Sequence, residues 1–320
     1  MSEPETILVL TSQYDTTADL VVRALNERAA PVFRCDTSQL LAGLDFTAEL
    51  SNSAPRWLGH IRGPHRSVAL ENISCAYYRR PTAFATSGAN QDTRDWIALQ
   101  ARLGFGGVLA TTSRWLNHPS QIGYAEYKPV QFATAVHAGL SLPRTLITND
   151  PAAAMQFGED VGELVYKPLA SAGASPGTAV YTNRVTTAQL NDPTIRQTAH
   201  LFQEWVRKDH EVRLTMVDQR CFATAITAHS AAAKVDWRTD YASLSYRPVD
   251  TPPHVRNGML ALLGALGLRF AAADFAVTSE GKWIFLDLNP NGQWAWIAER
   301  TGVDIAGAIA DALIGTPVER

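Results

Sequence analysis

The sequence has 320 residues, of which 46% are hydrophobic and 18% are charged, and its formal net charge is -3. This composition is typical of a globular protein with room for two domains, and it lacks the strong positive charge that nucleic-acid binding usually requires. The 3 cysteines form no zinc or disulfide pattern, the acidic N-terminus does not resemble a signal peptide, and no stretch approaches the roughly 20 apolar residues of a membrane span. We therefore expect a cytoplasmic protein with no nucleic-acid and no membrane partner.

The first part of the chain has the pattern of a parallel sheet. Residues 6–10 are a short apolar run that predicts a buried strand, Asp15 can cap the helix that follows, and residues 31–35 predict a second strand. This β-α-β opening indicates parallel pairing, and no GxGxxG motif follows the first strand, so the dinucleotide fingerprint is missing. Further strands are expected at residues 48–62 and 73–78, and a long helix at about 92–110.

The Asn117-His118-Pro119 segment interrupts this regularity. We expect a first domain at residues 1–118 and a second at 119–320, with a central lobe at about 119–205 and a C-terminal lobe at about 206–320. The second domain is expected to contain helices at 128–140, 255–266 and 305–314, strands at 144–148, 164–168, 178–181, 201–206, 212–217 and 221–228, and a hairpin at 270–288.

The hairpin carries two acidic residues that should face each other. A turn centred on Glu280-Gly281 places Asp274 opposite Asp287, where Cβ atoms of an antiparallel pair lie about 4.5–5.5 Å apart. Asn289 is two residues beyond Asp287 and therefore projects from the same face. Two carboxylates and an amide oxygen are hard ligands that suit Mg²⁺, which would also relieve the repulsion between like charges. The alternative is a solvated hairpin face, but the strand around Asp287 is otherwise apolar.

A second set of residues can bind phosphate. Lys167 ends the apolar run Leu164-Val165-Tyr166 and is followed by small residues, from Ala170 to Gly177, whose backbone N–H groups could approach phosphate oxygens. Lys128 opens a helix, where a solvated lysine is the ordinary alternative.

Between two later strands lies the Glu204-Trp205-Val206 segment, whose backbone can meet an adenine edge, while Glu211 can accept from ribose hydroxyls. Arg213 and Arg238 are candidate clamps for phosphate or acyl phosphate, because guanidinium groups match such oxygens bidentately. Either arginine alone is more often part of a surface ion pair.

Taken in order, these segments resemble an ATP-grasp ligase, and in particular the ATP-grasp ribosomal peptide maturases, also called graspetide or omega-ester peptide synthetases. The resemblance covers nearly the whole chain. Besides the residues already named, it rests on Tyr77-Tyr78-Arg79-Arg80-Pro81, Asn117-His118-Pro119, the stretch from Gly139 to Asn149, and Val235-Asp236-Trp237-Arg238.

The resemblance implies an α/β (α+β) chain with an ATP-grasp fold and an N-terminal parallel-sheet lobe, the pre-ATP-grasp domain. It implies ATP and Mg²⁺ as cofactors. Many ATP-grasp ligases have glutamate where this chain has Asp287, and the shorter side chain must reach further. By analogy, Lys128 and Lys167 hold phosphates, Glu204, Trp205 and Val206 bind adenine, Glu211 binds ribose, Asp274, Asp287 and Asn289 bind Mg²⁺, and Arg213 and Arg238 stabilise the transferring phosphoryl group.

The activity that the resemblance implies is an ADP-forming ligation. Asp or Glu side chains of a ribosomal precursor peptide, with leader and core, become acyl phosphates and are joined to Ser or Thr hydroxyls as esters, or to Lys amines as amides. A homodimer is compatible with this reading. Two alternatives stay open, a ligase for free amino acids and a nucleotide- or peptide-binding module without turnover. No general base is evident, although Asp236 and His229 are candidates.

Overall fold

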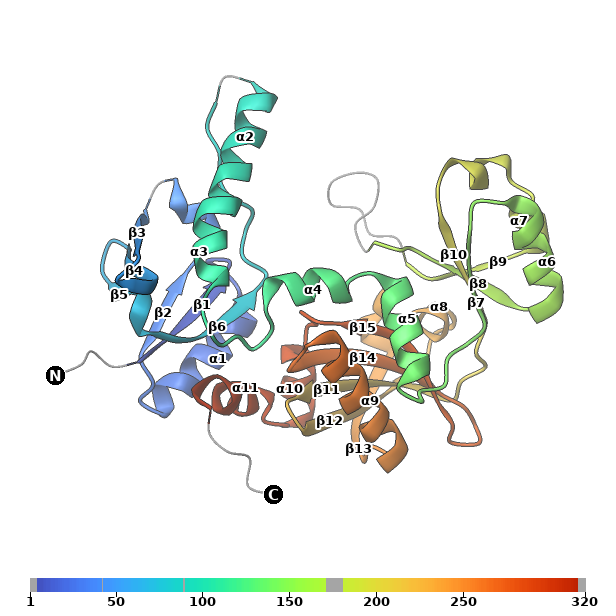
Figure 1. The fold of residues 1–320 in the computed structure, drawn as a ribbon. Coiled ribbons are helices and arrows are strands. Elements are labelled where there is room, and N and C mark those ends of the chain that lie inside the picture. The colour runs from blue at the N-terminus through green and yellow to red at the C-terminus, as the bar shows by residue number, and fades with distance from the viewer. Residues whose placement is uncertain (1–4, 42, 89, 171–180, 316–320) are drawn as a thin grey trace.

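The computed structural model describes residues 5–41, 43–88, 90–170 and 181–315, and the strands in these ranges form four sheets (Figure 1). None of the helices in these ranges is long and apolar enough to cross a membrane. The short 3-10 helices are η1 (Thr37–Leu40), η2 (Leu70–Asn72), η4 (Pro193–Gln197), η5 (Trp237–Thr239) and η6 (Tyr241–Ser243).

The first sheet is parallel, with the strand order β2-β1-β6. It consists of β1 (Thr6–Thr11), β2 (Val32–Cys35) and β6 (Ile73–Arg79), and α1 (Thr16–Glu27) connects the first two strands. The Asp15 side chain accepts hydrogen bonds from the backbone N–H groups at positions 17 and 18 and caps α1. The predicted β-α-β opening and its cap are therefore confirmed.

A small antiparallel sheet lies beside it, with the order β3-β4-β5. Its strands are β3 (Asp45–Ser51), β4 (Ala54–Arg62) and β5 (Ser67–Ala69). The prediction of a single strand at residues 48–62 was wrong, because the polar pair Asn52-Ser53 forms the turn of a hairpin.

The expected long helix at about 92–110 is confirmed. It consists of α2 (Gln91–Ala101), a π-helical segment (Arg102–Gly106) and α3 (Gly107–Ala110), and it projects from the first lobe in Figure 1. The chain then passes through α4 (Pro119–Ala125) to α5 (Lys128–His137), which leads into the second half of the molecule.

The central sheet has the order β7-β10-β8-β9 and is antiparallel. Most of the strand expected at 178–181 lies outside the described residues. Helix α6 was not expected, although Asp150 caps it and proline occupies its first position, a typical start signal. The elements are β7 (Thr145–Thr148), α6 (Pro151–Val161), β8 (Leu164–Lys167), β9 (Asn183–Val185), α7 (Thr187–Leu190) and β10 (His200–Glu204).

The largest sheet is antiparallel, with the order β13-β12-β11-β14-β15. Alternate apolar residues of β11, β14 and β15 pack against α5 and α9 in one core cluster. The expected strands, hairpin and helix in this region are present, whereas α8 and β13 were not expected. The elements are β11 (His210–Val217), β12 (Arg220–Ala228), α8 (Ala231–Val235), β13 (Leu244–Val249), α9 (Pro253–Leu266), β14 (Phe270–Val277) and β15 (Trp283–Asn289).

The last helices return to the first sheet. Helix α11 (Ile305–Ile314), as predicted, and α10 (Ala295–Thr301) share a core cluster with residues of β1, β6 and α1. Arg28 at the end of α1 donates to Asp311 of α11 over 2.7 Å. The N-terminal lobe and the C-terminal sheet are thus joined through a continuous apolar core.

Asn117, between α3 and α4, fastens the start of β14 to the end of β15. Its buried amide donates to the carbonyls of Phe270, over 2.7 Å, and Pro290, over 2.9 Å, and its oxygen accepts from the N–H groups of Arg269 and Phe270. Burying backbone groups without these partners is costly, so we expect Asn117→Ala to lower the free energy of unfolding by about 2–4 kcal/mol. Urea denaturation measures the change, and Asn257→Ala on the exposed face of α9 is the control; equal losses in both variants would contradict this role.

Candidate active site

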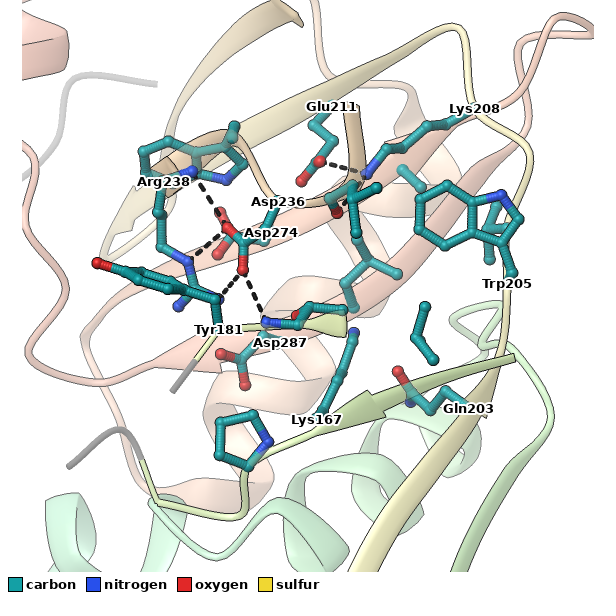
Figure 2. A pocket seen from close by; sticks show the side chains of 18 of the residues that line it. Lys167, Tyr181, Gln203, Trp205, Lys208, Glu211, Asp236, Arg238, Asp274 and Asp287 are labelled. Carbon is teal, nitrogen blue, oxygen red and sulfur yellow. Dashed lines mark hydrogen bonds and ion pairs between the residues drawn. The ribbon is translucent and has the colours of Figure 1, made fainter. Parts of the chain in front are cut away.

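A cavity of about 350 Å³ opens between the central sheet and the largest sheet (Figure 2). Most of the residues singled out in the sequence line it, which are Lys128, Lys167, Glu204, Trp205, Val206, Glu211, Arg238, Asp274 and Asp287. Arg213 and Asn289 are not among its lining residues. Nine of the eleven residues therefore line one cavity, and the roles assigned to them stay a prediction.

The two acidic residues of the hairpin are directly opposed, as predicted. Asp274 of β14 pairs with Asp287 of β15, but the turn is one residue shorter than expected, since Val277 pairs with Trp283. A bulge at Leu286 compensates, because it inserts one unpaired residue between Phe285 and Asp287. Leu286 and Asp287 consequently both line the cavity.

Each carboxylate is paired with a cation of the protein. Lys128 Nζ donates to Asp287 Oδ1 over 2.5 Å, and Arg213 NH1 donates to both oxygens of Asp274, over 2.9 and 2.8 Å. Burial would raise the pKa of Asp287, but Lys128 and Lys167 outweigh it and hold that pKa below its usual range. The expected repulsion between the two carboxylates is thus offset by the positive charges of Lys128 and Arg213.

The donor set fits a Mg²⁺ ion that takes its remaining ligands from the phosphates of the nucleotide. Two ionised carboxylates meet on one wall, and Mg²⁺ is commonly held by one or two carboxylates together with substrate phosphates. Within the described ranges, no three His, Cys, Asp or Glu side chains form a metal-binding group. Asn289 lies two residues beyond Asp287 on β15, paired with Ala272, and its Oδ1 accepts from the Asn291 N–H over 2.9 Å. An amide oxygen has two lone pairs, so Asn289 Oδ1 can keep this bond and still coordinate a metal ion.

Gln131, which sequence reasoning did not single out, positions Lys128. The Gln131 side chain is buried in α5 and pairs with β15 as a strand would: its Nε2 donates to the Leu288 carbonyl over 2.8 Å, and its Oε1 accepts from the Leu288 N–H over 3.1 Å. This docks the first turn of α5 on the strand that carries Asp287. No local sequence signal predicts such a contact, since it depends on how α5 and β15 pack.

Lys167 is the last residue of β8 and points into the cavity (Figure 2). Burial lowers the pKa of its ammonium group to about 8, although the nearby Asp287 favours the charged form. Among the described residues it has no hydrogen-bond or ion-pair partner, so the cavity contains a cation poised for an anion. The small-residue loop expected to bind phosphates with it lies outside the described residues from position 171 to 180.

The hinge segment presents backbone groups to the cavity. The N–H of Glu204 donates to the Arg144 carbonyl and that of Trp205 to the Glu163 carbonyl, over 2.9 and 2.8 Å, while that of Val206 has no acceptor among the described residues. A flat heteroaromatic base can therefore be met there by a free donor. Lys208 Nζ lies over the Trp205 ring, 5.1 Å from the ring centroid.

Glu211 lies on the same wall, where burial raises the pKa of its carboxyl group despite its bond with Lys208. It is placed to accept from hydroxyl groups of a ligand once Lys208 moves aside.

Comparison with solved structures identifies the fold. No protein-family profile and no curated protein sequence matches the chain. Solved structures do match over nearly its whole length. A ribosomal-peptide-associated ATP-grasp ligase of Chryseobacterium gregarium, in complex with ADP and a leader and core peptide, has a TM-score of 0.89 at 23% identity, covering 98% of this chain and 97% of that chain.

The macrocyclase MdnC, bound with the precursor peptide MdnA from Microcystis aeruginosa MRC, has a TM-score of 0.84 at 25% identity, over 97% of this chain and 100% of its own. The ATP-grasp ligase PsnB, complexed with a phosphomimetic variant of a minimal precursor, Mg and ADP, has a TM-score of 0.76 at 21% identity, over 98% and 99%. The chain has the ATP-grasp fold. The expected fold class and the resemblance to ATP-grasp peptide maturases are thereby confirmed.

The two arginines have different settings in this ATP-grasp fold. Arg213 is buried behind Asp274, which it holds bidentately, and is not on the cavity surface. Arg238 lines the cavity and is held by Asp236 over 2.8 and 2.5 Å. Arg238 therefore remains a candidate for direct contact with a transferred phosphoryl group. Arg213 contacts Asp274 instead and could influence such a group only through that carboxylate.

Of the two candidate bases, only Asp236 lines the cavity of the ATP-grasp fold, and its surroundings make it a weak base. Asp236 is buried and accepts from the Thr182 N–H as well as from Arg238. Burial would raise the pKa of Asp236, but Arg238 outweighs it and keeps that pKa below its usual range, so the carboxylate is a poor proton acceptor. His229 bonds with Ser245 over 3.1 Å and is not among the residues that line the cavity.

Proposed function

We propose that this protein is an ATP- and Mg²⁺-dependent, ADP-forming ligase for a ribosomal precursor peptide. It phosphorylates Asp or Glu side-chain carboxylates and joins them to Ser or Thr hydroxyls as esters, or to Lys amines as amides, to form macrocycles. The observation that carries the proposal is the cavity itself. In it, Lys167, which has no ion-pair partner among the described residues, lies with two opposed carboxylates beside a hinge whose Val206 N–H has no acceptor in the same part of the chain. Similarity over the whole chain to ligases solved with precursor peptides and ADP supports the peptide as substrate.

Nucleotide binding uses the hinge and the lysines. In the proposal, the Val206 N–H meets adenine, Glu211 accepts from ribose, and Lys128 and Lys167 contact phosphate oxygens. Asp274, Asp287 and Asn289 would hold Mg²⁺, which neutralises charge on the phosphates when bound. Lys128 then exchanges its carboxylate partner for a phosphate, which frees Asp287 for the metal.

The chemistry proceeds in two displacements. A substrate carboxylate oxygen attacks the γ-phosphorus of ATP, the bond to the bridging oxygen breaks, and ADP leaves with an acyl phosphate remaining. In the proposal, Arg238 stabilises charge on the transferred group, and positioning and electrostatics dominate catalysis of this kind. A hydroxyl or amine then attacks the acyl carbon, phosphate departs, and the nucleophile loses its proton.

We also propose that residues 1–118 form the pre-ATP-grasp domain and residues 119–320 the ATP-grasp domain. The break at Asn117-His118-Pro119, between α3 and α4, supports this division. Because α10 and α11 share a core with the first sheet, the two domains should unfold together.

The test is product analysis with the small precursor peptide encoded beside the gene. With ATP and Mg²⁺, each link should remove one water from the peptide and release one ADP and one phosphate, as chromatography and mass spectrometry can count. Mild alkali should open esters and spare amides. AMP as the nucleotide product would overturn the mechanism, whereas an unchanged peptide mass with ADP released on free amino acids would overturn the peptide assignment.

A further inference from the structure

A second cavity, of about 690 Å³, lies at the carboxyl ends of the parallel strands β1 and β6. Its walls come from the segment between β1 and α1, from the residue after β6, and from the start of α10. In open α/β sheets, ligands commonly bind in the crevice outside the carboxyl ends of the strands. Its volume is within the usual range for ligand sites, roughly 300–1,000 Å³.

Arg79, the last residue of β6, ties this region to the segment that follows β15. Its side chain is buried and donates to the Asn291 carbonyl over 2.9 Å and to Gln293 Oε1 over 2.5 Å, with Asp15 3.6 Å from its Nε. The charge of Arg79 is therefore used within the protein.

Arg80 has no ion-pair partner among the described residues. Its backbone has a φ of 47°, an uncommon conformation for a residue with a side chain, and its Nε donates to the same Asn291 carbonyl over 3.1 Å. Its other guanidinium N–H groups have no acceptor among the described residues, and no carboxylate there forms an ion pair with it. Asp15 lines the same cavity, but its carboxylate lies 3.6 Å from Arg79 Nε, so Arg80 has no ion-pair partner of its own among the described residues.

Aromatic side chains separate this second cavity from the first one, which holds the candidate active site. Trp296 lines the second cavity, and its ring lies 5.1 Å from that of Trp237 and 6.2 Å from that of Tyr241, both of which line the first. A chain bound in the second cavity would thus be separated from the first cavity by these aromatic side chains. Glu299 also lines the second cavity and supplies a negative charge there.

We propose that the second cavity binds a segment of the acidic substrate peptide and that Arg80 binds one of its side-chain carboxylates, other than the one being activated. The inference rests on the proposed function and adds a recognition site to it. The edge of the Arg80 guanidinium formed by its two Nη groups suits a carboxylate, which it can hold bidentately. Such a site would favour acidic peptides and fix which carboxylate reaches the γ-phosphate.

The experiment compares two fluorescein-labelled probes, a pentaglutamate and a pentaglutamine peptide, by fluorescence anisotropy at low salt. The wild-type protein should bind the acidic probe more tightly, and Arg80→Gln should weaken that binding by about fivefold to tenfold, as loss of a partly exposed charged pair does. Arg80→Lys should restore part of the affinity. Arg256→Gln, at an exposed arginine on α9, is the matched control and should change nothing, while Glu299→Gln should leave or strengthen acidic-probe binding.

Binding of AMPPNP, measured by calorimetry in the same variants, separates this inference from the proposed function. If AMPPNP binds normally and Arg80→Gln retains wild-type affinity for the pentaglutamate, the assignment of Arg80 is wrong while the ligase proposal stands. Equal losses for both probes would indicate a folding defect and would also overturn it. If the wild-type protein does not bind AMPPNP, the proposed function itself fails.

Discussion

Asp287→Asn should lower the rate of peptide-dependent ADP release by about a thousandfold, because the substitution removes a hard anionic ligand from the wall that faces the phosphates. The amide keeps the size of the side chain, so the change isolates its charge. Asp287→Glu should retain part of the activity, since the resemblance implies that glutamate serves at this position in many ATP-grasp ligases. Asp160→Asn on the exposed end of α6 is the control. Full activity of Asp287→Asn would contradict the proposed metal site.

The same variant should also be less stable without ligands. The pKa of Asp287 in the folded protein is held below its usual value, so its carboxylate stabilises the fold above about pH 4 and this contribution disappears as the pH falls through the folded-state pKa. The loss in Asp287→Asn should therefore be visible at pH 7 and vanish in strong acid. Thermal unfolding across this range measures it.

Lys167→Met should weaken AMPPNP binding at pH 7 by about tenfold to a hundredfold, the usual value of a hydrogen bond to a charged group. Methionine keeps the apolar stem and deletes the ammonium group. Without nucleotide, however, the variant should be more stable than the wild type by roughly 1–3 kcal/mol, because it removes a partly buried charge that has no ion-pair partner among the described residues. Calorimetry and urea denaturation give the two quantities, with Lys282→Met in the exposed hairpin turn as the control.

The pH dependence gives a further check on Lys167. Its pKa of about 8 is below the ordinary 10.5, so the unfolded chain binds more protons between these values, and the stability of the wild type should rise with pH in this window. Nucleotide affinity should fall as the pH rises above 8, since the lysine loses its charge. Both trends should be absent in Lys167→Met. Unchanged affinity together with unchanged pH profiles would mean that Lys167 only fills space.

The elements that could be predicted from the sequence are those with a strong local pattern. The apolar run of β1, with Asp15 after it, and the apolar face of α11 show their periodicity within a few residues, and both were found as expected. The hairpin of β3 and β4 was missed because the alternation of side chains continues through a two-residue turn. The start of α6 had a recognisable cap, so that omission was a failure of interpretation.

In the candidate site, too, the features with a local pattern could be predicted and the contacts between distant segments could not. The opposition of Asp274 and Asp287 was predicted from a turn one residue too long, and it holds because the bulge at Leu286 restores the register. The bonds between Gln131 and β15, and the ion pair between Lys128 and Asp287, depend on packing between segments more than 150 residues apart. No local pattern encodes those contacts, and the pairing of Arg213 with Asp274 was invisible for the same reason. The pairing of Glu211 with Lys208, by contrast, is local and was overlooked.

The sharing of one core between β1, α1 and α11 has a consequence for how the chain is made. During synthesis, the N-terminal sheet leaves the ribosome long before α11, and until then the apolar residues that α11 covers have no partner. Domains usually fold in the order in which they are synthesised, but contacts between distant segments form slowly. The lobe that is made first is therefore completed among the last. A nascent chain stalled before Ile305 would display an apolar surface of the kind that chaperones and proteases act upon.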